Sequence, residues 1–387
     1  VSQEHPPPLM YIYHSILCIS RQVLIFLEKL RKLRPILVIQ LKIERMAAMS
    51  CMTGAQTRCL RNAPSVLSFA AVGGRFEGEG PLRDYFDELS EDHFFGEKTW
   101  EKGESAMQRR ALSHALEKAA LRERDLDLIF AGDLLNQCTG SSFALRSSRI
   151  PFYGVYGACS TMGESLSLAA IMVDGGYAER AAALTSSHFC TAERQYRMPV
   201  PYGSQRTPTA QWTATGSGCC ILSREGEGPY ITHVTAGRIV DKGVTDANNM
   251  GAAMAPAAYD TLCALFRDTQ TAPEDYDLIV TGDLGKLGHR IVADFFTRDG
   301  ISLGERFTDC GLLLYDIDAQ DMHCGGSGCG CSASVFCGYL LRGMREGRWQ
   351  RIVFAPTGAL LSPTSTFQGE SIPGICHALV LSNRKEG

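Results

Sequence analysis

Long apolar runs are missing from this sequence. The apolar patches between residues 11 and 44 are broken by charged side chains at Arg21, Glu28, Lys29, Arg31, Lys32 and Arg34. A membrane-spanning helix requires about 20 consecutive apolar residues. We therefore expect no transmembrane segment.

A basic excess is also missing. The 387 residues carry a formal net charge of −4, and residues 1–45 hold seven Lys or Arg against three Asp or Glu. The remainder has 31 of the 38 basic and 39 of the 42 acidic residues, a net charge near −8. Such a surface repels phosphates, so a nucleic acid is not expected as a partner.

Cysteine is abundant, but an arrangement typical of disulfides or of zinc sites is missing. The count of 15 is odd, and many of these residues lie in small or apolar runs, as at Cys219, Cys220 and Cys337. Buried, reduced thiols are the expected state. The cluster at His323, Cys324 and residues 329–331 lacks paired CxxC spacing, so no metal site is expected there.

Residues 1–45 allow two interpretations. They could form a basic amphipathic helix on anionic lipid. Alternatively, translation begins at Met46, Met49 or Met52. We favour the second interpretation because the segment lacks a clear apolar face. We treat residues 1–45 as an extension outside the fold.

An internal repeat organises the rest of the chain. The segment 125–134 recurs as 275–284 with seven of ten positions identical, and each copy is an apolar run that ends in Gly-Asp. This pattern predicts a buried strand, and a helical pattern precedes each copy at 106–121 and 257–266. Each half continues with a Gly/Cys-rich turn, a helix and a further strand, at 180–185 and 351–355. We predict an α/β protein with two duplicated halves, 46–228 and 229–387.

The turn at Cys159 is the motif with the clearest chemical potential. An apolar stripe at Leu166, Ala169, Ala170 and Val173 predicts a helix that stops at residues 175–176. Thr161 and Glu164 have capping-box spacing, so Cys159 would lie at the helix N-terminus. There the helix dipole would lower the thiol pKa and favour a nucleophile. The alternative is a small buried residue that packs a tight turn.

These features together resemble a known family. A Cys on a strand-to-helix turn within a duplicated α/β chain is similar to the thiolase and β-ketoacyl synthase superfamily. A denser resemblance, from about residue 68 to residue 382, is to the stage V sporulation protein AD family. Its motifs occur in order at 132–137, 157–161, 185–188, 208–212, 249–256, 281–284, 307–311, 327–332 and 357–362.

The resemblance implies a thiolase-like fold with α/β/α/β/α layers, and a homodimer. It also implies a sporulation protein that binds dipicolinic acid during uptake into the developing spore. Such a protein would be peripheral to the forespore inner membrane and would work with membrane-embedded proteins of the stage V sporulation A group. The resemblance implies no cofactor and leaves open whether calcium accompanies the ligand.

Condensing chemistry requires more than a thiol. Members of the superfamily add a His with an Asn or a second His, or a second Cys, to handle protons and the oxyanion. Where a synthase would place its His this chain has Asp283, and near the Asn position it has Asp309. A carboxylate beside the thiol would raise its pKa. We therefore expect Cys159 to be a vestigial nucleophile, with an active acyltransferase that uses Cys159 as the alternative.

The expected ligand site combines donors with the Cys159 turn. A rigid aromatic dianion requires Arg or N–H donors and flat apolar walls. The loop after the strand at 180–185 offers His188, Arg197, Tyr202 and Gln205. A solvated loop with an ordinary Glu193–Arg197 pair is the alternative. Asp133, Asp283 and Asp309 could hold calcium beside the ligand or could simply close turns.

Overall fold

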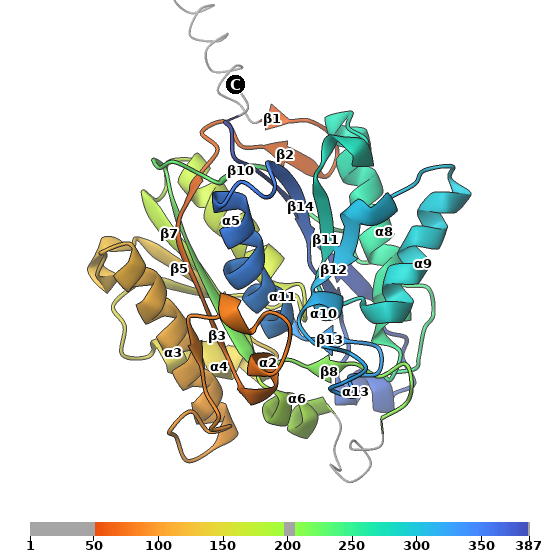
Figure 1. Cartoon of the computed structure of the whole chain (residues 1–387), viewed down its shortest axis with the longest axis horizontal. Helices are drawn as coiled ribbons and strands as arrows, with labels where there is room; N and C mark the ends of the chain where they lie inside the picture. Colours follow the sequence, from red (N-terminus) through yellow and green to blue (C-terminus); the bar gives the residue numbers. More distant parts are fainter. Residues whose placement is uncertain (1–50, 197–205, 386–387) are drawn as a thin grey trace, which may run out of the picture. The chain divides into compact units, whose positions relative to one another are not determined.

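The computed structural model describes residues 51–196 and 206–385, and a large sheet runs through this part of the chain (Figure 1). The predictions for residues 1–45, Arg197, Tyr202 and Gln205 concern positions outside these ranges. Helices lie on both faces of the sheet, as the repeat of strands and helices in the sequence predicts.

The sheet consists of two five-strand segments with the same order and directions. The first has the order β3 (Ser65–Gly73), β9 (Gly216–Ser223), β7 (Arg180–Ser187), β5 (Leu128–Gly132) and β6 (Phe152–Gly154). The second has the order β10 (Tyr230–Thr235), β17 (Ala378–Ser382), β14 (Arg351–Ala355), β11 (Leu278–Thr281) and β12 (Phe307–Asp309). In each segment the first two pairings are antiparallel and the last two are parallel.

Alternating side chains on these strands produce five layers. In β5, Phe130 packs in a central core that contains residues of α5 (Thr161–Asp174) and α11 (Cys329–Val335), whereas Ile129 packs outward beside α3 (Trp100–Lys118). In β11, Val280 faces the same central core, and Ile279 packs with α8 (Met250–Thr269) and α9 (Gly285–Arg298). Strands buried on both faces explain why these segments read as continuous apolar runs. The layered α/β/α/β/α prediction is confirmed.

Shorter elements complete the part of the chain that the structure describes. They are β1 (Cys51–Met52), β2 (Thr57–Cys59), α2 (Arg75–Gly78), β4 (Glu88–Leu89), α4 (Thr139–Leu145), α6 (Phe189–Tyr196), β8 (Trp212–Thr213), α10 (Cys310–Leu313), β13 (Gly326–Ser327), α12 (Leu341–Arg345), β15 (Thr357–Ala359), α13 (Pro363–Phe367) and β16 (Gly374–Cys376). A π-helical turn at Phe336–Leu340 leads into α12.

One predicted boundary is wrong. The helix expected at 257–266 begins at Met250, because Asn249 caps it and accepts the N–H of Ala252 at 3.4 Å. Pro256 therefore lies inside α8, where it removes one backbone hydrogen bond. Burial of the surrounding residues 253–258 against the second sheet segment outweighs that cost.

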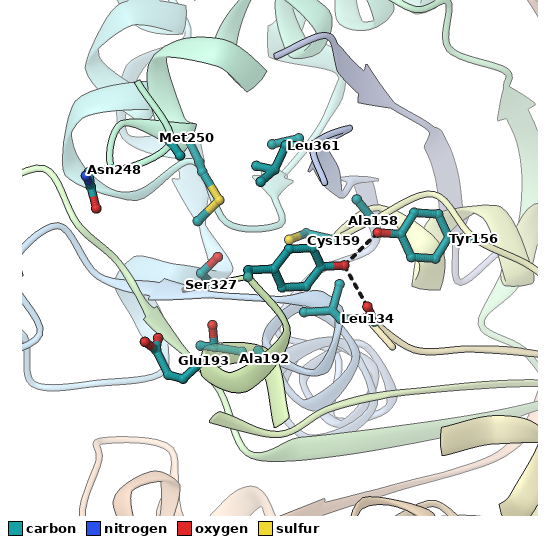
Figure 2. A pocket seen from close by; sticks show the side chains of 14 residues that line it. Leu134, Tyr156, Ala158, Cys159, Ala192, Glu193, Asn248, Met250, Ser327 and Leu361 are labelled. Atoms are coloured by element: carbon teal, nitrogen blue, oxygen red, sulfur yellow. Dashed lines mark hydrogen bonds between the residues drawn. The ribbon is translucent and has the colours of Figure 1, made fainter. Parts of the chain in front are cut away.

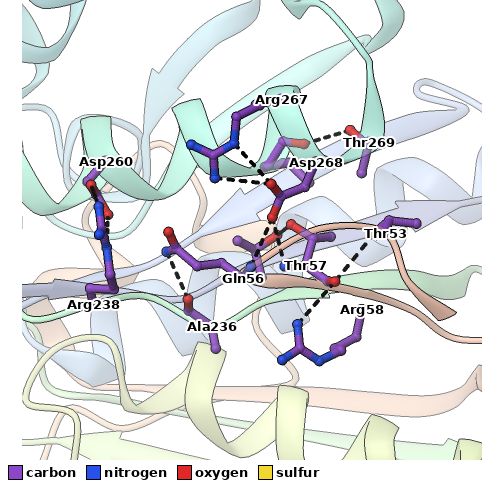
Figure 3. Close-up of polar contacts among 12 residues, drawn as sticks. Thr53, Gln56, Thr57, Arg58, Ala236, Arg238, Asp260, Arg267, Asp268 and Thr269 are labelled. Atoms are coloured by element: carbon purple, nitrogen blue, oxygen red, sulfur yellow. Dashed lines mark hydrogen bonds and ion pairs between the residues drawn. The ribbon is translucent and has the colours of Figure 1, made fainter. Parts of the chain in front are cut away.

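The two sheet segments are joined by a narrow seam. The register between β10 and β3 contains one residue pair, Tyr230 with Ser65. Beyond that point β2 covers β10, in antiparallel register from Thr57 opposite Thr235. Asp268 at the end of α8 fixes β2, since its carboxylate accepts the N–H groups of Gln56 and Thr57 at 3.0 Å each (Figure 3). The fold therefore depends on the chain from about residue 54 onward.

Candidate functional site

The turn that carries Cys159 joins β6 to α5 in a strained conformation. Ala158 has a φ of 49°, in the left-handed region that L-residues rarely adopt. Ser160 Oγ donates to Gly157 O at 2.7 Å, and Thr161 Oγ1 donates to Ala158 O at 2.5 Å while accepting the Gly157 N–H at 3.1 Å. The expected capping box is therefore wrong. Thr161 is the first helical residue and binds the turn behind it, and no side chain caps α5.

The second half of the chain packs directly against this turn. A Cβ added to Gly358 in β15 would lie 2.3 Å from Gly157 O and 3.2 Å from the Cys159 nitrogen. Only glycine permits that approach. The Cys159 turn is thus held between an α5 start from one half and a strand from the other.

Asp283 follows β11 and reaches the same turn. Its Oδ2 accepts hydrogen bonds from Ser327 Oγ at 3.0 Å and from the Gly328 N–H at 2.9 Å, and its Oδ1 accepts one from Thr357 Oγ1 at 3.0 Å. The thiol of Cys159 lies close enough to this carboxylate for each group to shift the pKa of the other. Asp283 is fully buried, and burial raises its pKa to about 6.

The thiol of Cys159 is held in its neutral form. Burial raises its pKa well above the usual value, and the negative charge and hydrogen bond of Asp283 raise it further. The N–H of Gly328 and the hydroxyl of Ser327 oppose this shift but do not overcome it. The expectation that the helix dipole lowers the pKa of Cys159 is therefore wrong, because burial and then a carboxylate from the other half outweigh the dipole.

Asp309 holds the turn that follows Asp283. It is fully buried, and its two oxygens accept hydrogen bonds from Thr281 Oγ1, from the N–H groups of Leu284 and Gly285, and from the N–H of Gly311. Those bonds fix the turn that follows Asp283. Asp309 is absent from the residues that line the pocket described next.

A pocket of about 80 Å³ opens in front of Cys159 (Figure 2). Its walls are mostly apolar and come from both halves of the chain. They include Leu134, Tyr156, Ala158, Cys159, Ala192, Glu193, Tyr196, Thr213, Ala247, Asn248, Met250, Ser327, Ala359 and Leu361. Among these described lining residues, Glu193 is the one that carries a formal charge.

Two tyrosines form the aromatic wall. The hydroxyl groups of Tyr156 and Tyr196 lie 2.8 Å apart, and Tyr196 also donates to Leu134 O at 2.6 Å. Burial raises the pKa of Tyr156 to about 12 and raises that of Tyr196 as well. Both phenols are therefore neutral, so this wall is flat and uncharged.

The structure places His188 away from the pocket lining. Its side chain is buried at the end of β7, where Nε2 lies 2.8 Å from His93 O and Nδ1 accepts the Cys190 N–H at 3.1 Å. Burial lowers the pKa of His188 to about 4, so the ring is neutral and Nε2 is the donor. His188 thus braces the start of α6 and does not face the pocket.

The described arginines beside this loop are engaged elsewhere. Arg194 pairs with Glu101 at 2.7 Å and lies over Trp100, and Arg206 pairs with Asp321 at 2.7 Å. Within residues 51–196 and 206–385, no group of three or more His, Cys, Asp or Glu side chains is arranged to hold a metal ion.

Sequence reasoning missed several pocket residues. Tyr156, Tyr196, Asn248, Met250 and Leu361 come from separate segments that only the fold brings together. Two of them could have been predicted from a helix N-terminus, because the N-terminus of a helix near the ends of the strands commonly borders a ligand site. Asn248 and Met250 flank the cap of α8.

Comparison with known proteins identifies the family. The family model for stage V sporulation protein AD matches residues 54–382. This chain belongs to that family. The stage V sporulation protein AD of Bacillus subtilis (strain 168) is 44% identical over 329 residues, which cover 85% of this chain and 97% of that protein.

Solved structures of other proteins share the fold. The 3-oxoacyl-[acyl-carrier-protein] synthase III of Aquifex aeolicus VF5 has a TM-score of 0.52 at 14% identity, covering 82% of this chain and 99% of that one. OleA of Xanthomonas campestris has a TM-score of 0.54 at 15% identity, covering 84% and 99%. At this identity the likeness establishes the thiolase-like fold of this family member and nothing about its activity.

Proposed function

We propose that this family member is a non-catalytic sporulation protein that binds dipicolinic acid, the ligand expected from the family resemblance, during its uptake into the developing spore. The observation that carries the proposal is the position of the buried Cys159 thiol beside the buried carboxylate of Asp283, which keeps the thiol neutral. A condensing enzyme requires a thiolate at this position and proton-transfer groups opposite it. Here a carboxylate opposes thiolate formation, which leaves a pocket suited to binding.

The pocket offers dipicolinate a flat wall and a polar end. Tyr156 and Tyr196 can flank the pyridine ring, and the N-terminus of α5 favours a carboxylate. A cavity that binds benzene has about 150 Å³, and this one has about 80 Å³. The ring therefore enters partly, and its second carboxylate stays at the mouth, where we propose that Arg197, Tyr202 and Gln205 supply donors.

We further propose that calcium accompanies the ligand. Glu193 lines the pocket, and a carboxylate there repels a free dianion. A calcium ion bound by dipicolinate removes the net charge of the ligand and accepts carboxylate and amide oxygens. Glu193 and Asn248 are the described lining residues with such oxygens.

Calorimetric titration tests the binding proposal. Dipicolinate should give a saturable heat, with and without calcium chloride, and isophthalate should bind more weakly because it lacks the ring nitrogen. Cys159→Ala should weaken binding only slightly, since the thiol is a wall. No heat with dipicolinate under either condition would refute the proposal.

We also propose that two copies pair through β6. This strand ends the sheet, its free edge is exposed, and Tyr153 and nearby Phe143 on α4 are 55% and 53% exposed. An antiparallel pairing of β6 with its own copy about a two-fold axis would cover that edge. Light scattering should give a dimer mass for the protein and a monomer mass for Tyr153→Lys. A monomer mass for the unchanged protein at about 10 µM would refute this assembly.

The proposed location is the forespore, at the face of its inner membrane. Within the described ranges no helix has the length and apolarity to cross a bilayer. We propose that membrane-embedded proteins of the stage V sporulation A group hold the protein there. Co-purification from detergent extracts of sporulating cells tests this, and recovery of the protein without any such partner would contradict it.

Acyl transfer is the second candidate. Cys159 lies on a strained turn at a helix start, in a fold that solved condensing enzymes share. Incubation with acetyl-CoA or malonyl-CoA and intact-mass measurement tests it. We expect no adduct, and a stable acyl group on Cys159 would favour the enzyme.

A further inference from the structure

Two buried carboxyl groups lie behind the pocket, outside the site described above. Glu104 in α3 and Asp133 after β5 are both fully buried. A hydrogen-bonded chain links them: Ser141 Oγ donates to Asp133 Oδ2 at 2.7 Å, Ser186 Oγ donates to Glu104 Oε1 at 2.9 Å, and Gln108 Nε2 donates to both hydroxyl oxygens at 3.0 and 2.7 Å. Neither carboxyl group has an ion pair among the described residues.

The hydrogen bonds distinguish the two groups. Asp133 accepts two backbone N–H groups as well as the Ser141 hydroxyl, which suits an ionised carboxylate. Glu104 accepts no backbone N–H in the structure. Its Oε2 lies 2.7 Å from Thr191 Oγ1, which is itself 2.9 Å from His188 O. The single Thr191 proton can serve only one of these acceptors, so a proton on Glu104 completes the chain by donating to Thr191.

Thr191 belongs to α6, and α6 is one wall of the pocket. Ala192, Glu193 and Tyr196 of this helix line the pocket, and Ala192 and Glu193 are labelled in Figure 2. The hydrogen bond between Glu104 and Thr191 thus links the buried carboxyl groups to the helix that forms this wall. The helix has only eight residues, and the bond from Thr191 to Glu104 is the buried side-chain contact that ties its first turn to α3, whereas Tyr196 and Arg194 hold its last turn.

We propose that Glu104 carries a proton while Asp133 is ionised, and that the proton on Glu104 holds α6 against α3, so that the pocket wall loosens when Glu104 ionises. On ionisation the proton leaves for solvent, and two negative charges joined through Ser141, Gln108 and Ser186 remain buried without a cation. Glu104 is then a positioning residue for the pocket. This inference depends on α6 as a wall and not on the identity of the ligand.

The surroundings of the pair favour the neutral form of Glu104. Burial, and then the charge of Asp133, raise the pKa of Glu104 to about 8, and burial raises that of Asp133. The other titratable groups that interact with the pair are Glu101 on α3, whose partner is Arg194, the buried thiol of Cys329 on α11, the thiol of Cys138 and the phenol of Tyr156. None of them supplies a positive charge to the pair at neutral pH.

Amide hydrogen exchange of residues 189–196 tests the proposal on the ligand-free protein. After correction for intrinsic exchange rates, protection of α6 in the unchanged protein should fall at least tenfold between pH 6.5 and pH 9. Glu104→Gln, which fixes the neutral form, should change less than threefold. Glu117→Gln, which changes an exposed residue at the end of α3, is the matched control and should behave like the unchanged protein. Identical profiles for the unchanged protein and Glu104→Gln would overturn the proposal.

If Glu104→Gln does not fold, two variants of Thr191 test the same hydrogen bond from the other side. Thr191→Val keeps the shape of the side chain and removes its hydroxyl, so α6 should lose protection tenfold at pH 6.5, and Thr191→Ser should restore it. Normal protection in Thr191→Val would overturn the proposal. A dipicolinate titration that fails while these exchange results hold would refute the ligand assignment and leave this inference standing.

Discussion

The replacement Asp283→Asn tests whether the carboxylate holds the Cys159 thiol neutral. Asn has the same shape and can still accept hydrogen bonds from Ser327 and Gly328, but it removes the negative charge beside the sulfur. For two unit charges about 4 Å apart at an effective dielectric constant near 20, the interaction is about 4 kcal/mol, which is the order of magnitude expected for this pair. We therefore expect the thiolate population of Cys159 to rise on the order of a hundredfold to a thousandfold.

Alkylation by iodoacetamide measures this directly, because the thiolate is the reactive species. The rate is followed at the peptide that contains Cys159 and should rise at least a hundredfold at pH 7 in Asp283→Asn. Cys190, half-buried on α6 and remote from Asp283 in the hydrogen-bond network, is the internal control and should react at an unchanged rate. A rise of less than threefold at Cys159 would show that burial alone sets its reactivity.

The same variant should also change stability in a pH-dependent way. The pKa of Asp283 is about 6 in the folded protein and 3.8 is the ordinary value, so folding favours its protonated form. The stability that protonated Asp283 contributes to the fold is fully present below about pH 4 and is lost as the pH rises through about 6. The difference in free energy of unfolding between Asp283→Asn and the unchanged protein should therefore shift in favour of the variant by roughly 3 kcal/mol from pH 4 to pH 7. Denaturant unfolding at both pH values measures the difference, and equal gains at the two would contradict the assignment.

The remaining predictions concern the chain start and the pocket mouth. A protein that begins at Met46 should melt within a few degrees of the full chain, because the anchoring of β2 starts at about residue 54. A protein that begins at Leu60 should lose roughly 3–6 kcal/mol, because Asp268 keeps its pair with Arg267 but loses two N–H donors, and a hydrogen bond to a charged group is worth about 1.5–3 kcal/mol; equal melting temperatures for the two truncations would contradict this. Arg197→Ala should weaken dipicolinate binding by about 1.5–3 kcal/mol in a titration if the side chain bonds a carboxylate, and an unchanged affinity would remove Arg197 from the site. Gly358→Ala should destabilise the fold and weaken the same binding, as its Cβ has no room beside Gly157; a variant with normal melting and affinity would show that β15 can move away.

Much of the fold was predictable from the sequence because it rests on local patterns. The repeat at 125–134 and 275–284 predicts β5 and β11 correctly, and the strand predicted at 351–355 coincides with β14. Apolar periodicity places these elements, and duplication relates them. Burial against the sheet cannot be seen in the local sequence pattern. For that reason the helix was predicted to start after Pro256, whereas α8 begins before it.

The site was less predictable, because its chemistry depends on contacts between distant segments. The pKa of Cys159 is raised by burial and then by Asp283, both of which arise only when the two halves pack together. The hydroxyl of Thr161 binds the turn because Ala158 is left-handed, a conformation that the residue types around it do not indicate. His188 was expected as a ligand donor, and the burial of β7 turns it inward.

The narrow seam between the sheet segments has a mechanical consequence. Elsewhere in the sheet several backbone bonds resist sliding of neighbouring strands, but between β10 and β3 the register contains one residue pair, reinforced by β2. Sliding of one segment past the other is therefore resisted at this seam mainly by β2 and by the single pair of Tyr230 with Ser65. Because the pocket takes walls from both segments, a small displacement at the seam would change the width of the pocket.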